Sequence, residues 1–142
     1  MRYLAVLFLI ILNFACQKEI SVPTSEFEYN KNKWESLGVN SYKYTFQISC
    51  FCIPDVTLPK VIEVIDGEIM SVNEIPYDDE LHWGILSIAQ LFDVIEKAEK
   101  NNVAVLDVKY HQEQGYPISV YIDRDKMIAD EEIDYSVTSL SY

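Results

Sequence analysis

The sequence predicts an α+β domain, with an antiparallel sheet of about five to six strands and two helices packed on one face, in the order α-β-β-β-α-β-β-β. Three observations predict this class. Several short segments alternate apolar and polar residues, an Asp-Gly pair separates two of them, and two other segments combine helical spacing with a capping motif. The short connections between the predicted strands favour antiparallel neighbours.

The N-terminal segment has the pattern of an export signal. An uncharged apolar run from Leu4 to Leu12 follows one basic residue, and it is shorter than the roughly 20 residues that span a bilayer. Ala15-Cys16 comes next, as at a bacterial lipoprotein cleavage site. The alternative is an ordinary secreted protein in which Cys16 is incidental. We expect residues 1–15 to be a lipoprotein signal peptide, residues 16–25 a tether lipidated on Cys16, and residues 26–142 a single domain.

The chain is strongly acidic, with a formal net charge of −12 from 23 acidic and 11 basic residues. This balance argues against nucleic acid and against an anionic lipid surface as partners. Several acyl chains on Cys16 would anchor the chain firmly, so we expect it to contact the membrane through lipid. The expected location is the bacterial cell envelope, as an outer-membrane lipoprotein that faces the periplasm or the exterior.

A first helix is predicted from the capping box that Ser25 and Glu28 form. Phe27 and Trp34 follow at helix-compatible spacing, and Gly38 is a suitable residue to end the helix. A strand comes next, because the pattern changes to a period of two and leads directly into two cysteines. The apolar residues of this strand are Tyr42, Tyr44, Phe46 and Ile48.

The Asp66-Gly67 pair predicts a tight hairpin between strands at 61–65 and 68–72, because a type I′ turn needs positive φ at both central residues. Residues 75–84 are expected to form a loop. A second helix is predicted to begin after Ser87, where Gln90 completes another capping box. Its apolar stripe is Ile88, Leu91, Phe92, Ile95 and Ala98. Three more strands are predicted at 103–110, 118–123 and 133–140.

Cys50 and Cys52 lie one residue apart, just before Pro54. On an extended strand their side chains share a face, with Cα atoms near the outer limit of about 6.8 Å for a disulfide, so a local bend would close the gap. A disulfide is the default expectation in an exported protein. The alternatives are a redox-active pair and a metal site. Redox catalysts usually carry Cys-x-x-Cys at a helix start, and zinc needs about four ligands.

Asp123 and Asp125 open an acidic segment whose spacing is typical of the start of a calcium loop. Met127 and Ile128 then stand where an EF-hand needs an acidic residue and a glycine. A solvated turn between two strands is the simpler interpretation. Asp123, Asp125 and Asp130 remain weak candidates for calcium ligands.

The sequence has no catalytic signature. It contains two histidines, His82 and His111, in separate predicted loops, so a nucleophile–base pair is hard to build. We therefore predict that the protein is not an enzyme and needs no cofactor. Tyrosine and tryptophan dominate binding hot spots, so exposed aromatic residues in the loops are the expected contact surface. The candidates are Phe51, Trp83, His111 and Tyr116.

Several motifs follow one another along the predicted domain. They are Trp34, Tyr42–Phe46 before Cys50-x-Cys52, Asp66-Gly67, Leu91-Phe92, Tyr110 before Gly115-Tyr116-Pro117, Ile122-Asp123 and Asp130-Glu131-Glu132. Their order and spacing resemble those of a family of small bacterial secreted or lipoprotein domains of unknown function. His111 departs from the pattern, which has an Asp after the Tyr. The resemblance covers residues 28–140 and implies a fold and an envelope location, with no known activity.

The leading hypothesis is a non-catalytic cell-envelope lipoprotein that acts by binding an envelope protein or ligand. One alternative is an envelope thiol–disulfide redox protein that uses Cys50 and Cys52. Another is a calcium-dependent binding module.

Overall fold

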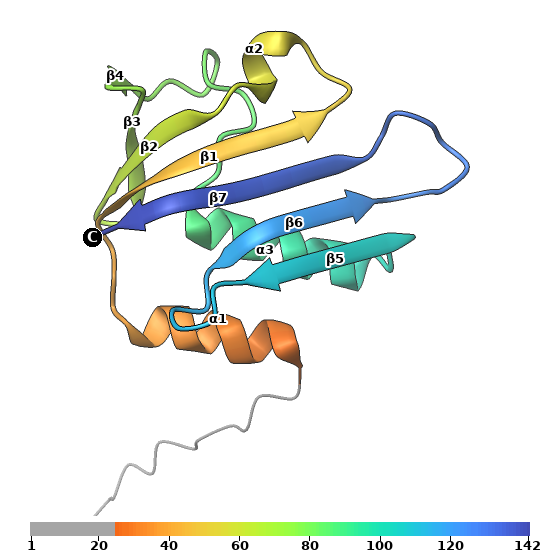
Figure 1. The fold of residues 1–142 in the computed structure, drawn as a ribbon, viewed down its shortest axis with the longest axis horizontal. Coiled ribbons are helices and arrows are strands. Elements are labelled where there is room, and N and C mark those ends of the chain that lie inside the picture. Colours follow the sequence, from red (N-terminus) through yellow and green to blue (C-terminus); the bar gives the residue numbers. More distant parts are fainter. Residues whose placement is uncertain (1–24) are drawn as a thin grey trace, which may run out of the picture.

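The computed structural model describes residues 25–142. The predicted signal peptide and the lipidation site Cys16 lie outside these residues. The described chain forms one antiparallel sheet of seven strands together with three helices. Figure 1 shows the sheet with α3 (Ile88–Lys100) behind it and α1 (Glu26–Ser36) along one side. The third helix, α2 (Pro54–Thr57), follows the first strand.

The sheet joins two runs of strands, each made of neighbours in the sequence. The spatial order is β4-β3-β2-β1-β7-β6-β5, so the first and last strands pair at the centre of the sheet. α3 connects the two runs. The strands are β1 (Tyr42–Cys50), β2 (Lys60–Ile65), β3 (Glu68–Val72), β4 (Ile75–Pro76), β5 (Val105–Tyr110), β6 (Pro117–Asp123) and β7 (Ile133–Ser141).

The prediction of five to six strands and two helices misses two short elements. β4 lies inside the segment that the sequence predicts as a loop, and it pairs with β3 through Ser71 opposite Pro76 and Val72 opposite Ile75. Two residues are too few to show alternation, and a proline in a sheet is confined to an edge position such as this one. α2 has four residues, which are too few to show a helical period.

The turn and capping signals of the sequence, which involve only neighbouring residues, are confirmed. Asp66 and Gly67 both adopt positive φ, at 51° and 85°, as the predicted hairpin turn requires. The Ser25 side chain accepts a hydrogen bond from the amide of Glu28 at 3.1 Å. At the start of α3, Ser87 and Gln90 form both bonds of the capping box.

α3 covers one face of the sheet and contacts β5 and β6. Its predicted stripe is buried at Ile88, Leu91, Phe92, Ile95 and Ala98. These side chains belong to the same core as the buried residues of the strands. In β1 the buried residues alternate with polar residues on the opposite face. Burial of this apolar stripe is the main interaction that holds α3 against the sheet.

α1 packs differently from the predicted arrangement, in which both helices lie on the sheet. The aromatic side chains of α1 instead contact α3, the start of β1 and the loop before β6. The ring of Phe27 contacts Phe92 of α3 with 6.1 Å between centroids. The ring of Trp34 lies 5.5 Å from Tyr42 and 5.6 Å from Tyr116. α1 therefore closes one end of the core, while α3 covers the sheet.

Two tyrosines of β1 hold the start of α3 in place. The Tyr42 hydroxyl accepts a hydrogen bond from the Ile88 amide at 3.1 Å, and the Tyr44 hydroxyl donates to the Leu86 carbonyl. Burial raises the pKa of Tyr44 well above its ordinary value, so this hydroxyl stays a donor at every physiological pH. The two bonds fix residues 86–88 against β1, and with them the loop that precedes α3.

Gly115 is the position where the fold leaves no room for a side chain. Its φ is 82°, and a Cβ there would lie 2.5 Å from the Asn30 carbonyl oxygen and 3.2 Å from the Trp34 amide nitrogen of α1. We expect Gly115→Ala to lower the free energy of unfolding by about 3 kcal/mol, because it combines backbone strain with a clash against backbone atoms. Urea unfolding measures this loss.

The matched control is Gly67→Ala. Gly67 has a similar φ of 85°, but a Cβ there would meet nothing within 4 Å. This substitution should therefore cost only the strain of the left-handed backbone, about 1 kcal/mol. Equal losses in the two variants would show that α1 does not pack closely against the loop that contains Gly115.

Candidate functional site

A groove of about 370 Å³ lies where β1 ends and β7 begins. We call it the disulfide groove, because Cys50 and Cys52 form part of its wall. Cys50 is directly opposite Ile133 in the pairing of β1 with β7, so the ends of these two strands meet there. Besides the two cysteines and the aromatic residues Phe51 and Trp83, the apolar part of its lining consists of Ile48, Leu86, Val94, Ile133 and Tyr135.

The disulfide shapes one side of the groove. Cys50 and Cys52 are joined, with their Cα atoms 5.2 Å apart. The chain bends between them, since the Cys52 amide donates to the Cys50 carbonyl at 2.8 Å, which is the local bend that the spacing predicts. Phe51 lies between the two cysteines, and 81% of its surface is exposed. The bond therefore presents an aromatic ring to solvent at the edge of the groove.

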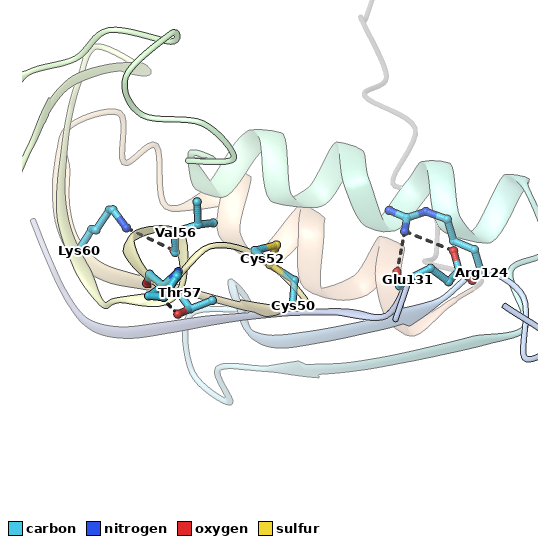
Figure 2. The surroundings of a disulfide bond; sticks show 8 residues. Cys50, Cys52, Val56, Thr57, Lys60, Arg124 and Glu131 are labelled. Atoms are coloured by element: carbon cyan, nitrogen blue, oxygen red, sulfur yellow. Dashed lines mark hydrogen bonds and ion pairs between the residues drawn. A yellow bond between two sulfur atoms is a disulfide. The ribbon is translucent and has the colours of Figure 1, made fainter. Parts of the chain in front are cut away.

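α2 supports the exit from the disulfide. Figure 2 shows Cys50 and Cys52 between α2 on one side and the pair of Arg124 and Glu131 on the other. The Lys60 amine donates to the carbonyls of Val56 and Leu58 at 3.3 and 3.2 Å, at the C-terminal end of α2. A lysine at this end satisfies carbonyls that have no partner within the helix.

Trp83 lines the groove and belongs to a loop that is held by its own hydrogen bonds. The Asp78 side chain accepts from the amides of Glu80 and Leu81 at 2.9 and 3.3 Å, and the His82 amide donates to the Asp78 carbonyl at 2.8 Å. Trp83 follows this turn with 60% of its surface exposed.

Gly84 lets this loop approach β1 closely. A Cβ on Gly84 would lie 2.9 Å from the Ile48 Cδ1 atom, and its φ is 77°. Only glycine combines that conformation with such a close approach. The loop therefore lies directly on the end of β1, with Trp83 beside the disulfide.

The third side of the groove is acidic. Asp130, Glu131 and Glu132 line it, together with Arg124. The Arg124 guanidinium donates to the Glu131 carbonyl at 3.1 Å and lies 3.7 Å from its carboxylate, which also accepts from the Asp125 amide. Glu131 is thus engaged in holding the loop. In the described part of the chain, neither Asp130 nor Glu132 pairs with a lysine or arginine.

A second hollow of about 440 Å³ adjoins the disulfide groove on the outer face of the sheet. We call it the acidic hollow. It shares Phe51, Asp130 and Glu132 with the groove and adds Tyr121 and Asp134. Burial raises the pKa of Asp134; the charge of Lys109 opposes this shift and that of Asp107 adds to it. Burial and the charges of Asp123, Glu132 and Asp134 raise the pKa of Tyr121.

The structure brings together two of the predicted contact residues and separates the other two. Phe51 and Trp83 both line the disulfide groove. His111 and Tyr116 lie beyond the opposite end of β1, where their rings stack with 4.9 Å between centroids. Tyr116 is 5% exposed and packs on Trp34, so its role is in the core. The Nδ1 atom of His111 accepts from the Gln114 amide at 3.2 Å.

The three aspartates considered for calcium are not arranged as a metal site. Asp123 ends β6 with a buried side chain, whose Oδ1 has no hydrogen-bond partner within the described residues. Asp125 accepts from the Met127 amide at 3.0 Å and so belongs to its own turn. Residues 25–142 contain no group of three or more His, Cys, Asp or Glu placed to hold a metal ion.

Comparison with known proteins adds one result. The sequence model of one protein family matches residues 26–142. The chain belongs to a family of unknown function (DUF6174). This confirms the resemblance as far as membership of such a family; export and lipid attachment go beyond what the match shows. No curated protein and no solved structure gives a significant match. None of the described helices of this DUF6174 chain is long and apolar enough to cross a membrane.

Sequence reasoning missed much of the groove in this DUF6174 domain. The sequence predicts Ile133 and Tyr135 only as part of a strand and Val94 as part of the second helix, and it assigns no role to Leu86. Their place in the lining depends on the pairing of β1 with β7, which no local pattern specifies. The ion pair of Arg124 with Glu131 was also missed, although basic and acidic residues alternate with short spacing in that segment.

We expect loss of the disulfide to affect the groove more than the fold. The double substitution Cys50→Ser/Cys52→Ser should lower the free energy of unfolding by less than about 2 kcal/mol, because the bond closes a loop around a single residue. Amide hydrogen exchange at position 52, where the N–H donates to the Cys50 carbonyl, should accelerate. Urea unfolding and exchange measured by NMR test both statements.

Ile48→Ala serves as the reference for the loss of unfolding free energy in the cysteine variant. Ile48 is buried in the same region, and truncating such a residue costs about 2–5 kcal/mol. A loss from the cysteine variant as large as that from Ile48→Ala would contradict a local role for the disulfide.

Proposed function

We propose that this chain is a cell-envelope lipoprotein whose domain binds a partner and performs no catalysis. The export-signal pattern and Cys16 support the location. The observation that carries the binding function is the disulfide groove, where Phe51 and Trp83 expose aromatic rings above an apolar lining. Clustered exposed apolar groups with a polar rim are typical of interaction sites.

A hollow lined by three aromatic residues at the other end of β1 supports binding less well. It has about 280 Å³ and lies between α1, α3 and the turn of β2 with β3. Its aromatic residues Trp34, Tyr42 and Phe92 are buried, so they serve the core. A partner gains most from aromatic side chains that are exposed before binding and covered afterwards.

The arrangement of the histidines supports a non-catalytic function. His82 and His111 lie in separate loops, and the Nδ1 atom of each lies within hydrogen-bond distance of the backbone of its own loop. The redox alternative has less support, since the cation in the lining of the groove, Arg124, is engaged by Glu131. A low thiol pKa is favoured by a free positive charge or by a helix start beside the cysteine. α2 does begin at Pro54, two residues after Cys52, but its four residues make only about one turn, so its dipole is weak.

The anchor is tested by metabolic labelling with a palmitate analogue. We expect label on the wild-type chain and none on Cys16→Ser, because only a cysteine thiol can accept the diacylglyceryl group. In cell fractionation the wild type should remain with membranes and the variant should not. Equal labelling of the two would contradict lipidation at Cys16.

Binding through the groove is tested by photo-crosslinking in cells, followed by purification of the tagged chain. We expect the wild type to capture a defined partner and Phe51→Ala/Trp83→Ala to capture at least about tenfold less, since truncating hot-spot aromatics costs 2 kcal/mol or more each. Both side chains are largely exposed, so the variant should fold normally.

The matched control is Leu58→Ala/Met127→Ala, which removes two exposed apolar side chains outside the groove. It should capture the same partner as the wild type. If the groove variant and the control capture equally, or if the wild type captures nothing, the proposed binding site is wrong.

A further inference from the structure

The groove combines an apolar wall with an acidic rim whose charges are only partly neutralised. Glu131 is engaged by Arg124 and by the Asp125 amide. Asp130 and Glu132 flank it and lack a cationic partner among residues 25–142. The carboxylates of Asp130 and Glu132, beside exposed apolar surface, are therefore able to pair with a positive charge from another molecule.

The apolar and acidic parts of the surface are continuous. The disulfide groove and the acidic hollow share Phe51, Asp130 and Glu132, and their volumes are about 370 and 440 Å³. The hollow adds the carboxylate of Asp134, whose pKa is raised by burial. A ligand that spans both therefore meets an apolar pocket first and a group of carboxylates next to it.

The groove and the hollow share part of their lining, so one extended chain can reach both. In an extended peptide each residue advances by about 3.3 Å, so side chains two positions apart reach neighbouring pockets about 7 Å apart. An apolar side chain could occupy the groove between Phe51 and Trp83 while a basic side chain on the same face reaches Asp130 or Glu132.

We propose that the disulfide groove and the acidic hollow bind an extended basic segment of a partner protein. One apolar or aromatic side chain of that segment enters the groove, and a Lys or Arg beside it pairs with Asp130 and Glu132. This inference rests on the proposed binding function and names the chemistry of the partner. The net charge of −12 on the chain adds long-range attraction for such a segment.

A basic side chain of the partner also interacts favourably with the exposed aromatic residues. An arginine or lysine that approaches the exposed faces of Trp83 and Phe51 gains a cation–π contribution of about 0.5–1 kcal/mol at exposed sites. An acidic segment would meet repulsion from the same carboxylates, and like charges held close together suppress wrong partners. The selectivity for a basic segment thus comes from both attraction and repulsion.

The test uses the purified chain and three synthetic nine-residue peptides. The first repeats Phe-Ser-Arg-Ser, so that a Phe and an Arg two positions apart share a face, the second has Glu in place of Arg, and the third has Ser in place of Phe. We expect the first to bind at least about tenfold more tightly than the other two in isothermal titration calorimetry. Raising the salt from about 0.05 to 0.5 M should weaken its binding, because salt screens exposed charges.

Two double substitutions separate local from global charge. Asp130→Asn/Glu132→Gln removes the two rim carboxylates; Asn tolerates the positive φ of 64° at position 130. Glu68→Gln/Glu74→Gln removes the same charge from β3 and the turn after it. The rim variant should bind the Arg-Phe peptide about tenfold less tightly than the wild type. The control should bind within about twofold of the wild type.

Three results would overturn the inference. The Glu-Phe peptide could bind as tightly as the Arg-Phe peptide, the two double variants could bind alike, or none of the peptides could bind. In each case the photo-crosslinking of Phe51→Ala/Trp83→Ala decides separately whether the groove binds a partner of other chemistry, so failure of the inference is distinguishable from failure of the proposed function.

Discussion

The pairing of β1 with β7 is the interaction on which the rest of the structure depends. It joins the first and last strands of the sheet over a register from Lys43 opposite Ser141 to Cys50 opposite Ile133. Without it the chain would consist of two separate meanders, each with an unpaired inner edge that invites aggregation. The stacked rings of Phe46 and Tyr135, 6.0 Å apart, lie across this seam on the inner face.

The disulfide groove is a direct consequence of this pairing. Because Cys50 lies opposite Ile133, the disulfide and Phe51 come next to the acidic residues that precede β7, although about 80 positions separate them in the sequence. The loop before α3 adds Trp83, and the close approach of Gly84 to Ile48 brings it there. Three segments with no local relationship thus form one surface, and each is positioned by the strand or helix beside it.

The sequence predicts the elements whose signals are local and misses those that depend on contacts at a distance. The Asp66-Gly67 turn and the capping box of α3 involve only residues close together in the sequence, and both are present. The centre of the sheet could not be predicted, since alternation gives the inward face of a strand but not its neighbour. Trp83 and Tyr116 illustrate the same limit for the site: both are loop aromatics, yet only Tyr116 is covered, by the α1 helix that packs against its loop.

The most direct test of this account is NMR chemical-shift mapping of the isotope-labelled chain during titration with the Arg-Phe peptide. The account predicts that the changes centre on the indole N–H of Trp83 and on the amides of Phe51 and Ile133, at the end of the central strand pair. It predicts no change at Asn40 or His111, at the opposite end of β1. Changes that centre on those two residues, with none around the disulfide, would contradict the claim that the pairing of β1 with β7 builds the binding site.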